Sequence, residues 1–189
     1  MRTSKKTWAA IPLAVAGTIL TLHAPASAQA ADSRPAHAPL GVSSARVHLP
    51  DIATEWSLRQ AIGGAHEWLA SPGCQAVFSD FEDLSGKRLS DVLAERGLTG
   101  QEHLGRLGFY DGSRLPQCRV PGAAFRTSPG HALVYVCPAG FRRLSRTPHE
   151  ARGTIIHEVL HTLGLGENPP ASHEITQRVL ARCGRTDAR

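Results

Sequence analysis

Two histidines stand four residues apart in the segment TIIHEVLHTLGLGENPP, residues 154–170, and a glutamate directly follows the first of them. On a helix, side chains at positions i and i+4 project from successive turns about 6 Å apart. His157 and His161 can therefore each direct one ring nitrogen at a single zinc ion. Glu158 lies beside them without being a ligand. A carboxylate there can accept a proton from water activated by the ion and later deliver it to a leaving amine.

The pattern H-E-x-x-H resembles that of the zincin metallopeptidases, in which the histidines bind zinc and the glutamate is the general base. The metzincin branch continues as H-E-x-x-H-x-x-G-x-x-H; here Gly164 occupies the glycine position and Glu167 stands where the last histidine would be. The resemblance implies one Zn²⁺ held by His157, His161 and Glu167, since zinc accepts carboxylate oxygen at about 2.0 to 2.2 Å. It also implies hydrolysis of a peptide or protein substrate, with Glu158 as the catalytic residue.

The sequence departs from the metzincin pattern in one respect and leaves the third ligand open. Metzincins carry a methionine turn beneath the metal, whereas the only methionine of this chain is Met1. Gluzincins instead take a glutamate from a following helix, and SHEITQRVLARC, residues 172–183, predicts such a helix with Ser172 as its cap. His173 and Glu174 in its first turn are therefore alternative third ligands. An acid in the first turn of a helix is also explained by the helix dipole alone.

The helix that carries the motif has a predicted start and stop. Thr147 is a candidate N-cap, followed by proline at the first helical position and by Glu150 three residues after the cap, which together form a capping-box pattern. Gly164 can adopt the left-handed conformation that ends a helix after Leu163. The apolar positions then fall on one face and the histidines on the other, which should line a cleft.

The remaining sequence predicts an α+β fold, zincin-like by the resemblance. Such a fold has a small sheet whose edge strand lies beside the active-site helix, and a C-terminal helix. We expect the strand HALVYVC to be this edge strand, because an extended peptide substrate can pair with an exposed edge. Ser90 is the expected cap of a short helix that ends at Gly97. Patterning places a partly helical segment at 54–70 and strands at 75–78, 123–126 and 131–137.

The first 44 residues of the sequence differ in composition from the rest. Residues 1–30 combine a basic start, an apolar run and small-residue cleavage sites, which predicts a secretory signal peptide. Residues 31–44 are rich in Ala, Pro and Ser and predict a disordered leader. Residues 45–189 then form a single domain. We expect the protein to be secreted, extracellular or periplasmic, without stable membrane insertion once the signal is removed.

Charge and cysteine content indicate which binding partners and which disulfides to expect. Loss of Arg2, Lys5 and Lys6 with the signal leaves 18 basic and 16 acidic residues, and no basic stripe is interleaved with aromatics, so no nucleic-acid partner is expected. We expect a monomer. Four cysteines in an exported chain predict two disulfides out of three possible pairings, and we favour Cys118 with Cys137 and Cys74 with Cys183.

These observations favour a secreted zinc peptidase with Glu158 as its general base. The alternatives are a secreted zinc-binding module without turnover and an amidohydrolase acting on a cell-wall peptide. Tyr110 and Tyr135 are the two candidate oxyanion donors, although no spacing argument separates them from core aromatics. The other histidines are expected to be structural or solvated, namely His37, His48, His66, His103, His131 and His149.

Overall fold

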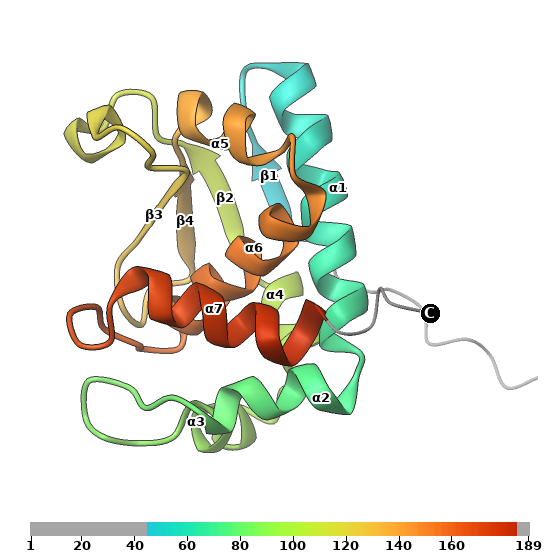
Figure 1. Cartoon of the computed structure of the whole chain (residues 1–189), viewed down its shortest axis with the longest axis vertical. Coiled ribbons are helices and arrows are strands. Elements are labelled where there is room, and N and C mark those ends of the chain that lie inside the picture. The colour runs from blue at the N-terminus through green and yellow to red at the C-terminus, as the bar shows by residue number, and fades with distance from the viewer. Residues whose placement is uncertain (1–44, 185–189) are drawn as a thin grey trace, which may run out of the picture. The chain divides into compact units, whose positions relative to one another are not determined.

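The computed structural model describes residues 45–184. The expected signal peptide (1–30) and leader (31–44) lie outside these residues. Among the residues described, no helix is both long enough and apolar enough to cross a membrane. The secondary structure combines helices with one small sheet, which confirms the predicted α+β class (Figure 1).

Four short strands form the sheet in the order β1-β2-β4-β3. The first three in this order run parallel, and β3 pairs antiparallel with β4. Val134 and Val136 of β4 are fully buried, as expected for an interior strand. The strands are β1 (Arg46–His48), β2 (Gly108–Asp111), β3 (Phe125–Thr127) and β4 (Leu133–Val136).

The prediction that HALVYVC is the edge strand was wrong. This segment contains β4, which pairs on one side with β2 and on the other with β3. The two edge strands are β1 and β3, and the one that contacts α6 is β3, close to the second strand expected at 123–126. The strand β2 was not predicted, and its pairing across more than twenty residues of sequence is what moves β4 into the interior.

The helices surround α6 (Pro148–Thr162), which carries the H-E-x-x-H motif. It packs against α1 (Ile52–Leu69) and α7 (Ser172–Cys183) and also contacts β3. Figure 1 shows α6 in orange, with the strands to one side and α1 to the other. The shorter helices are α2 (Pro72–Gln75), η1 (Ala76–Ser79), α3 (Leu89–Glu95), α4 (Gly100–Gly105), η2 (Pro116–Arg119) and α5 (Pro138–Leu144).

Two local predictions before α4 were wrong. The segment 75–78 is helical rather than a strand, because Ser71 caps a helical turn by accepting from the Cys74 backbone N–H at 3.2 Å and the chain continues as η1. Ser90 is not the cap of α3, which begins one residue earlier with Arg88 in the capping position.

The predicted start of α6 is correct in position, but the predicted capping does not occur. The helix begins at Pro148, yet the Thr147 side chain makes no capping hydrogen bond, so the predicted capping box is not formed. The predicted stop is confirmed. Gly164 has a φ of 116° and donates to the carbonyl of His161, while Leu165 donates to the carbonyl of Leu160. This pair of bonds is a Schellman motif, which ends the helix and turns the chain back.

Both favoured disulfides are confirmed. Cys74 pairs with Cys183 and Cys118 pairs with Cys137. The first joins α2 to the last residue of α7, and the second joins η2 to the residue that precedes α5. The Cys74–Cys183 bond spans 109 residues of sequence and so holds the C-terminal helix α7 against α2.

A buried histidine beneath α6 is also structural, as expected. His103 of α4 is 4% exposed, and its Nε2 lies 2.8 Å from Thr162 Oγ1. The Thr162 hydroxyl donates its proton to the carbonyl of Val159 at 2.7 Å, so His103 Nε2–H must be the donor in the first bond. Burial, followed by the positive charges of Arg96 and Arg106, lowers the pKa of His103 to about 4.

This pKa predicts a loss of stability in mild acid. His103 is neutral in the fold down to about pH 4, whereas in the unfolded chain it takes up a proton below about pH 6.5. The free energy of unfolding should therefore fall by about 3 kcal/mol between pH 6.5 and pH 4 on account of His103. Urea unfolding at several pH values should show a shallower decline for His103→Gln than for wild type. Equal slopes would contradict the prediction, since contributions from other groups are present in both proteins.

Candidate metal centre

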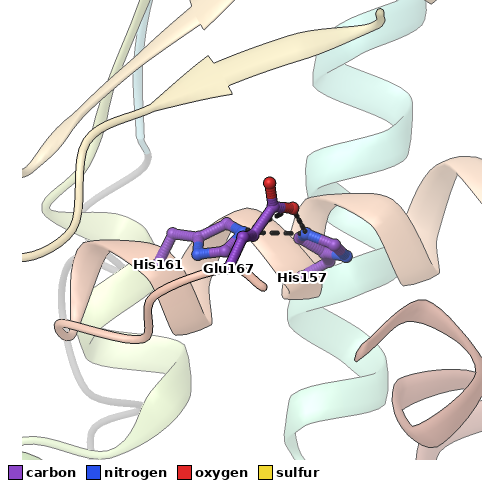
Figure 2. Close-up of side chains that lie close together, drawn as sticks. All are labelled: His157, His161 and Glu167. Atoms are coloured by element: carbon purple, nitrogen blue, oxygen red, sulfur yellow. Dashed lines mark hydrogen bonds and ion pairs between the residues drawn. The ribbon is translucent and has the colours of Figure 1, made fainter. Parts of the chain in front are cut away.

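Three side-chain atoms converge on one point above α6. His157 Nε2 and His161 Nε2 lie 2.9 Å apart, and Glu167 Oε1 lies 3.5 Å from the first and 3.4 Å from the second (Figure 2). Ligands bound at 2.0 to 2.1 Å in a tetrahedral zinc site lie roughly 3.3 Å from one another. The triangle therefore has the dimensions of three corners of such a tetrahedron. Among the residues described, these three form a group that can hold a metal ion.

The hydrogen bonds of the two imidazoles fix which nitrogen faces this point. His161 Nδ1 lies 2.8 Å from the Leu165 carbonyl, which can only accept. His157 Nδ1 lies 2.9 Å from the Thr176 hydroxyl, whose proton is donated to the Ser172 carbonyl at 3.2 Å. Both Nδ1 atoms must therefore carry the ring proton. In the neutral form, both Nε2 atoms then present lone pairs to the same point.

Three acceptors without a proton between them repel one another unless a cation lies among them. Burial, reinforced by the neighbouring His161, lowers the pKa of His157 to about 4, so this imidazole is neutral at neutral pH. Neutral imidazole is the form that binds metal. Two imidazole nitrogens and a carboxylate oxygen are a donor set that zinc accepts. The spacing of the three side chains and the neutral form of His157 therefore fit a metal ion such as zinc.

The Schellman turn after α6 positions two groups of the site. It brings the Leu165 carbonyl to His161, and it reverses the chain so that Glu167 returns over the two histidines. Burial alone would raise the pKa of Glu167, but the hydrogen bond from Ser172 and the two imidazoles hold it below its usual value. This carboxylate is therefore ionised at neutral pH, as a metal ligand must be.

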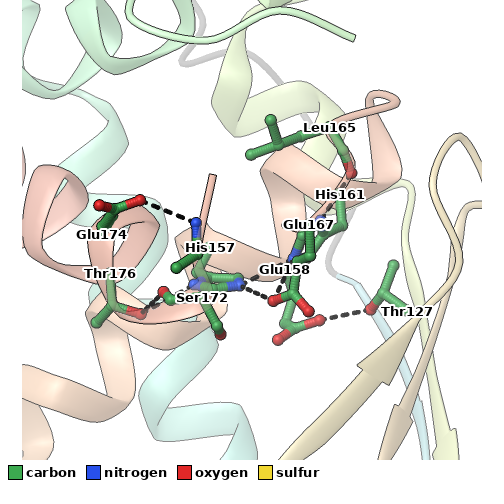
Figure 3. Close-up of polar contacts among 10 residues, drawn as sticks. Thr127, His157, Glu158, His161, Leu165, Glu167, Ser172, Glu174 and Thr176 are labelled. Carbon is green, nitrogen blue, oxygen red and sulfur yellow. Dashed lines mark hydrogen bonds and ion pairs between the residues drawn. The ribbon is translucent and has the colours of Figure 1, made fainter. Parts of the chain in front are cut away.

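The two alternative third ligands lie elsewhere. The Glu174 carboxylate accepts from the Ala171 backbone N–H at 2.9 Å, where it caps the start of α7 (Figure 3). The N-cap is Ala171 and not Ser172, which is the first helical residue. His173 is exposed on the same turn. Neither His173 nor Glu174 belongs to the group that can hold a metal.

Glu158 lies on the cleft side of α6 but outside the triangle. It is 7% exposed, and its Oε2 accepts a hydrogen bond of 2.6 Å from Thr127 Oγ1 on β3 (Figure 3). Burial raises the pKa of Glu158, and the bond from Thr127 acts in the opposite direction. A carboxylate whose proton affinity is raised by burial is better suited to accept a proton during a reaction.

These side chains open into a cleft of ≈ 540 Å³. One wall is the edge strand β3 with the residues just before it, and the others come from α5, α6 and the start of α7. Tyr110 and Tyr135 do not line it; Tyr110 stacks on His48 with ring centroids 5.0 Å apart. His149 also lies away from the metal ligands, packed edge-on against Trp68.

Sequence reasoning did not identify three residues that support this site. Thr127 orients Glu158 and Thr176 orients His157. Ser172 orients Glu167. Ser172 was expected only as a helix cap. Threonine and serine are common throughout the chain, and no spacing in the sequence relates them to the histidines.

Comparisons of the chain with family models, with curated proteins and with solved structures return no match.

Proposed function

We propose that this protein is a secreted, zincin-like metallopeptidase that hydrolyses peptide bonds with one zinc ion. His157, His161 and Glu167 would hold the ion, and Glu158 would act as general base. The observation that carries the proposal is the convergence of two imidazole Nε2 atoms and one carboxylate oxygen, at 2.9, 3.4 and 3.5 Å from one another, in the wall of a cleft. The proposed export rests on the N-terminal sequence and agrees with the two disulfides.

The proposed reaction is simple hydrolysis. When bound, zinc polarises the scissile carbonyl and lowers the pKa of a nearby water to about 7. Glu158 takes one proton from the attacking water as the oxygen bonds to the carbonyl carbon. The same carboxyl group then gives this proton to the peptide nitrogen as the C–N bond breaks. The products are an amine and a carboxylic acid that keeps the second proton of the water and then releases it to solvent at neutral pH, and Glu158 returns to its ionised state.

The edge strand β3 suggests how a peptide would be positioned. Its partner β4 lies on one side only, which leaves the other side of the strand unpaired beside the cleft. An extended peptide can add to such an edge through main-chain hydrogen bonds. The sequence suggested that HALVYVC would be the strand that pairs with the substrate; we assign this role to residues 125–127 instead.

Two features favour an enzyme over a zinc-binding module without turnover. A purely structural site closes its fourth position with another protein ligand, usually cysteine or histidine. Here three ligands face a cleft, and no fourth histidine, cysteine or acid joins them among residues 45–184. The second feature is Glu158, a buried carboxylate next to His157; burying its charge costs free energy, and a proton-accepting role in a reaction would explain why it is there.

The proposal is tested by metal analysis and a substrate screen. Mature protein should contain one zinc per chain by mass spectrometry, and it should cleave members of a peptide library. A chelator should abolish cleavage, and added zinc should restore it. Cleavage only of peptides built like cell-wall stems, with none of ordinary peptides, would favour the amidohydrolase alternative. Zinc without any cleavage would favour the binding module.

A further inference from the structure

We propose that Thr127 is a positioning residue that holds the general base Glu158 for the reaction. This inference rests on the proposed function. It concerns a side chain on the edge strand, 31 residues before Glu158 in sequence and outside the H-E-x-x-H motif.

The contact is short, and it is the one hydrogen bond to the Glu158 carboxylate among the residues described. Thr127 Oγ1 donates to Oε2 at 2.6 Å, as expected for a hydroxyl bound to a carboxylate. Within residues 45–184, the other carboxylate oxygen, Oε1, has no hydrogen-bond partner of this kind. The arrangement anchors one oxygen and leaves the second available to the attacking water.

Thr127 lies in a part of β3 that is held firmly in the sheet. Thr127 is opposite Val134 in the antiparallel pair of β3 and β4, and Val134 is fully buried. Phe125, two residues earlier on the same face, is buried and packs against Phe141 with ring centroids 5.4 Å apart. The β3 backbone that carries Thr127 is therefore held by pairing with β4 and by the core packing of Phe125.

This position ties the base to the strand that lines the cleft. A glutamate side chain has several rotatable bonds, and an unanchored carboxylate would populate several rotamers. The Thr127 bond selects one of them. Because β3 is also the strand beside which a peptide would lie, the same strand would position both the base and the substrate. Displacing a catalytic group by about 1 Å can lower a rate by about 100-fold.

The test compares Thr127→Val with Thr127→Ser in the zinc-loaded protein. Valine has nearly the same shape as threonine and is favourable in strands, so the sheet should be preserved. We expect Thr127→Val to lower kcat by about 10- to 100-fold with little change in KM, and Thr127→Ser to restore most of kcat. Zinc content should be the same in all three proteins.

Thr54→Val is the matched control. Thr54 also donates its hydroxyl to a carboxylate, that of Asp51, but at the start of α1 and away from the cleft. Its loss should lower stability without changing kcat. A fall in kcat equal to that of Thr127→Val would show that loss of a threonine–carboxylate bond acts through general destabilisation, and the positioning role would be rejected.

A crystallographic readout keeps the inference separate from the proposed function. In Thr127→Val, the Glu158 carboxylate should occupy more than one rotamer while His157 and His161 stay in place. If wild type cleaves peptides and Thr127→Val cleaves them equally well, the positioning role fails and the peptidase proposal survives. If wild type cleaves nothing, the peptidase proposal fails, and the Glu158 rotamers then decide whether Thr127 holds this carboxylate. A single unchanged rotamer would reject the inference.

Discussion

Replacing Glu158 by glutamine should lower kcat/KM for peptide hydrolysis by about 10²- to 10⁴-fold while zinc remains bound, because general base catalysis contributes about this much. Glutamine has the same length, and its amide oxygen can still accept from Thr127 Oγ1, so the geometry at the edge strand is kept. It cannot take a proton from water. The measurement combines steady-state kinetics with zinc analysis of the same sample.

Stability provides the control for this variant. Burial raises the pKa of Glu158, which means that the ionised carboxylate is disfavoured in the fold. A neutral amide removes this cost, so Glu158→Gln should unfold at the same temperature as wild type or a higher one. Full activity in a correctly folded, zinc-loaded Glu158→Gln protein would eliminate Glu158 as the base, and with it the proposed mechanism.

The second large effect is expected at Glu167. Glu167→Ala should weaken zinc binding by more than about 100-fold, because even residues that only orient metal ligands contribute 10- to 100-fold to affinity. Glu167 Oε1 lies 3.5 and 3.4 Å from the two Nε2 atoms and would be a ligand itself. Competition with a chromophoric chelator measures the affinity. Circular dichroism should show the helices intact, because this side chain is partly exposed and lies beyond the end of α6.

Glu174→Ala is the matched control for Glu167→Ala. Each variant removes one glutamate from the stretch after α6, but Glu174 only caps α7 through the Ala171 N–H. Its loss should cost a few tenths to about 1 kcal/mol of stability and leave zinc affinity unchanged. A large loss of zinc in Glu174→Ala together with normal binding in Glu167→Ala would reverse the assignment and favour a gluzincin-like site.

Features that depend on neighbouring residues could be predicted from the sequence. The period of the helix places His157 and His161 on one side, and Gly164 supplies the positive φ at which the helix ends. Spacing after that glycine then placed Glu167 as a candidate for the third corner. Each of these follows from backbone geometry over one or two turns, which does not depend on the rest of the chain.

Some local predictions failed because a side-chain pattern has more than one outcome. Thr147 has the residues of a capping box around it, yet its side chain makes no capping bond, and Pro148 begins the helix without it. Residues 75–78 are apolar enough for a strand, but the helical turn capped by Ser71 continues into them. Short apolar runs do not distinguish strand from helix by periodicity alone.

By itself, therefore, the sequence determined the motif helix, its end, the positions of the candidate ligands along it and the even cysteine count. Only the tertiary structure decided which strand forms the edge, because that depends on the pairing of β4 with both β2 and β3. It also decided that Thr176 orients His157 and that Thr127 reaches Glu158, contacts that span 19 and 31 residues. Such contacts form only when distant segments pack together, and no local rule of backbone conformation specifies which hydroxyl will meet which imidazole or carboxylate.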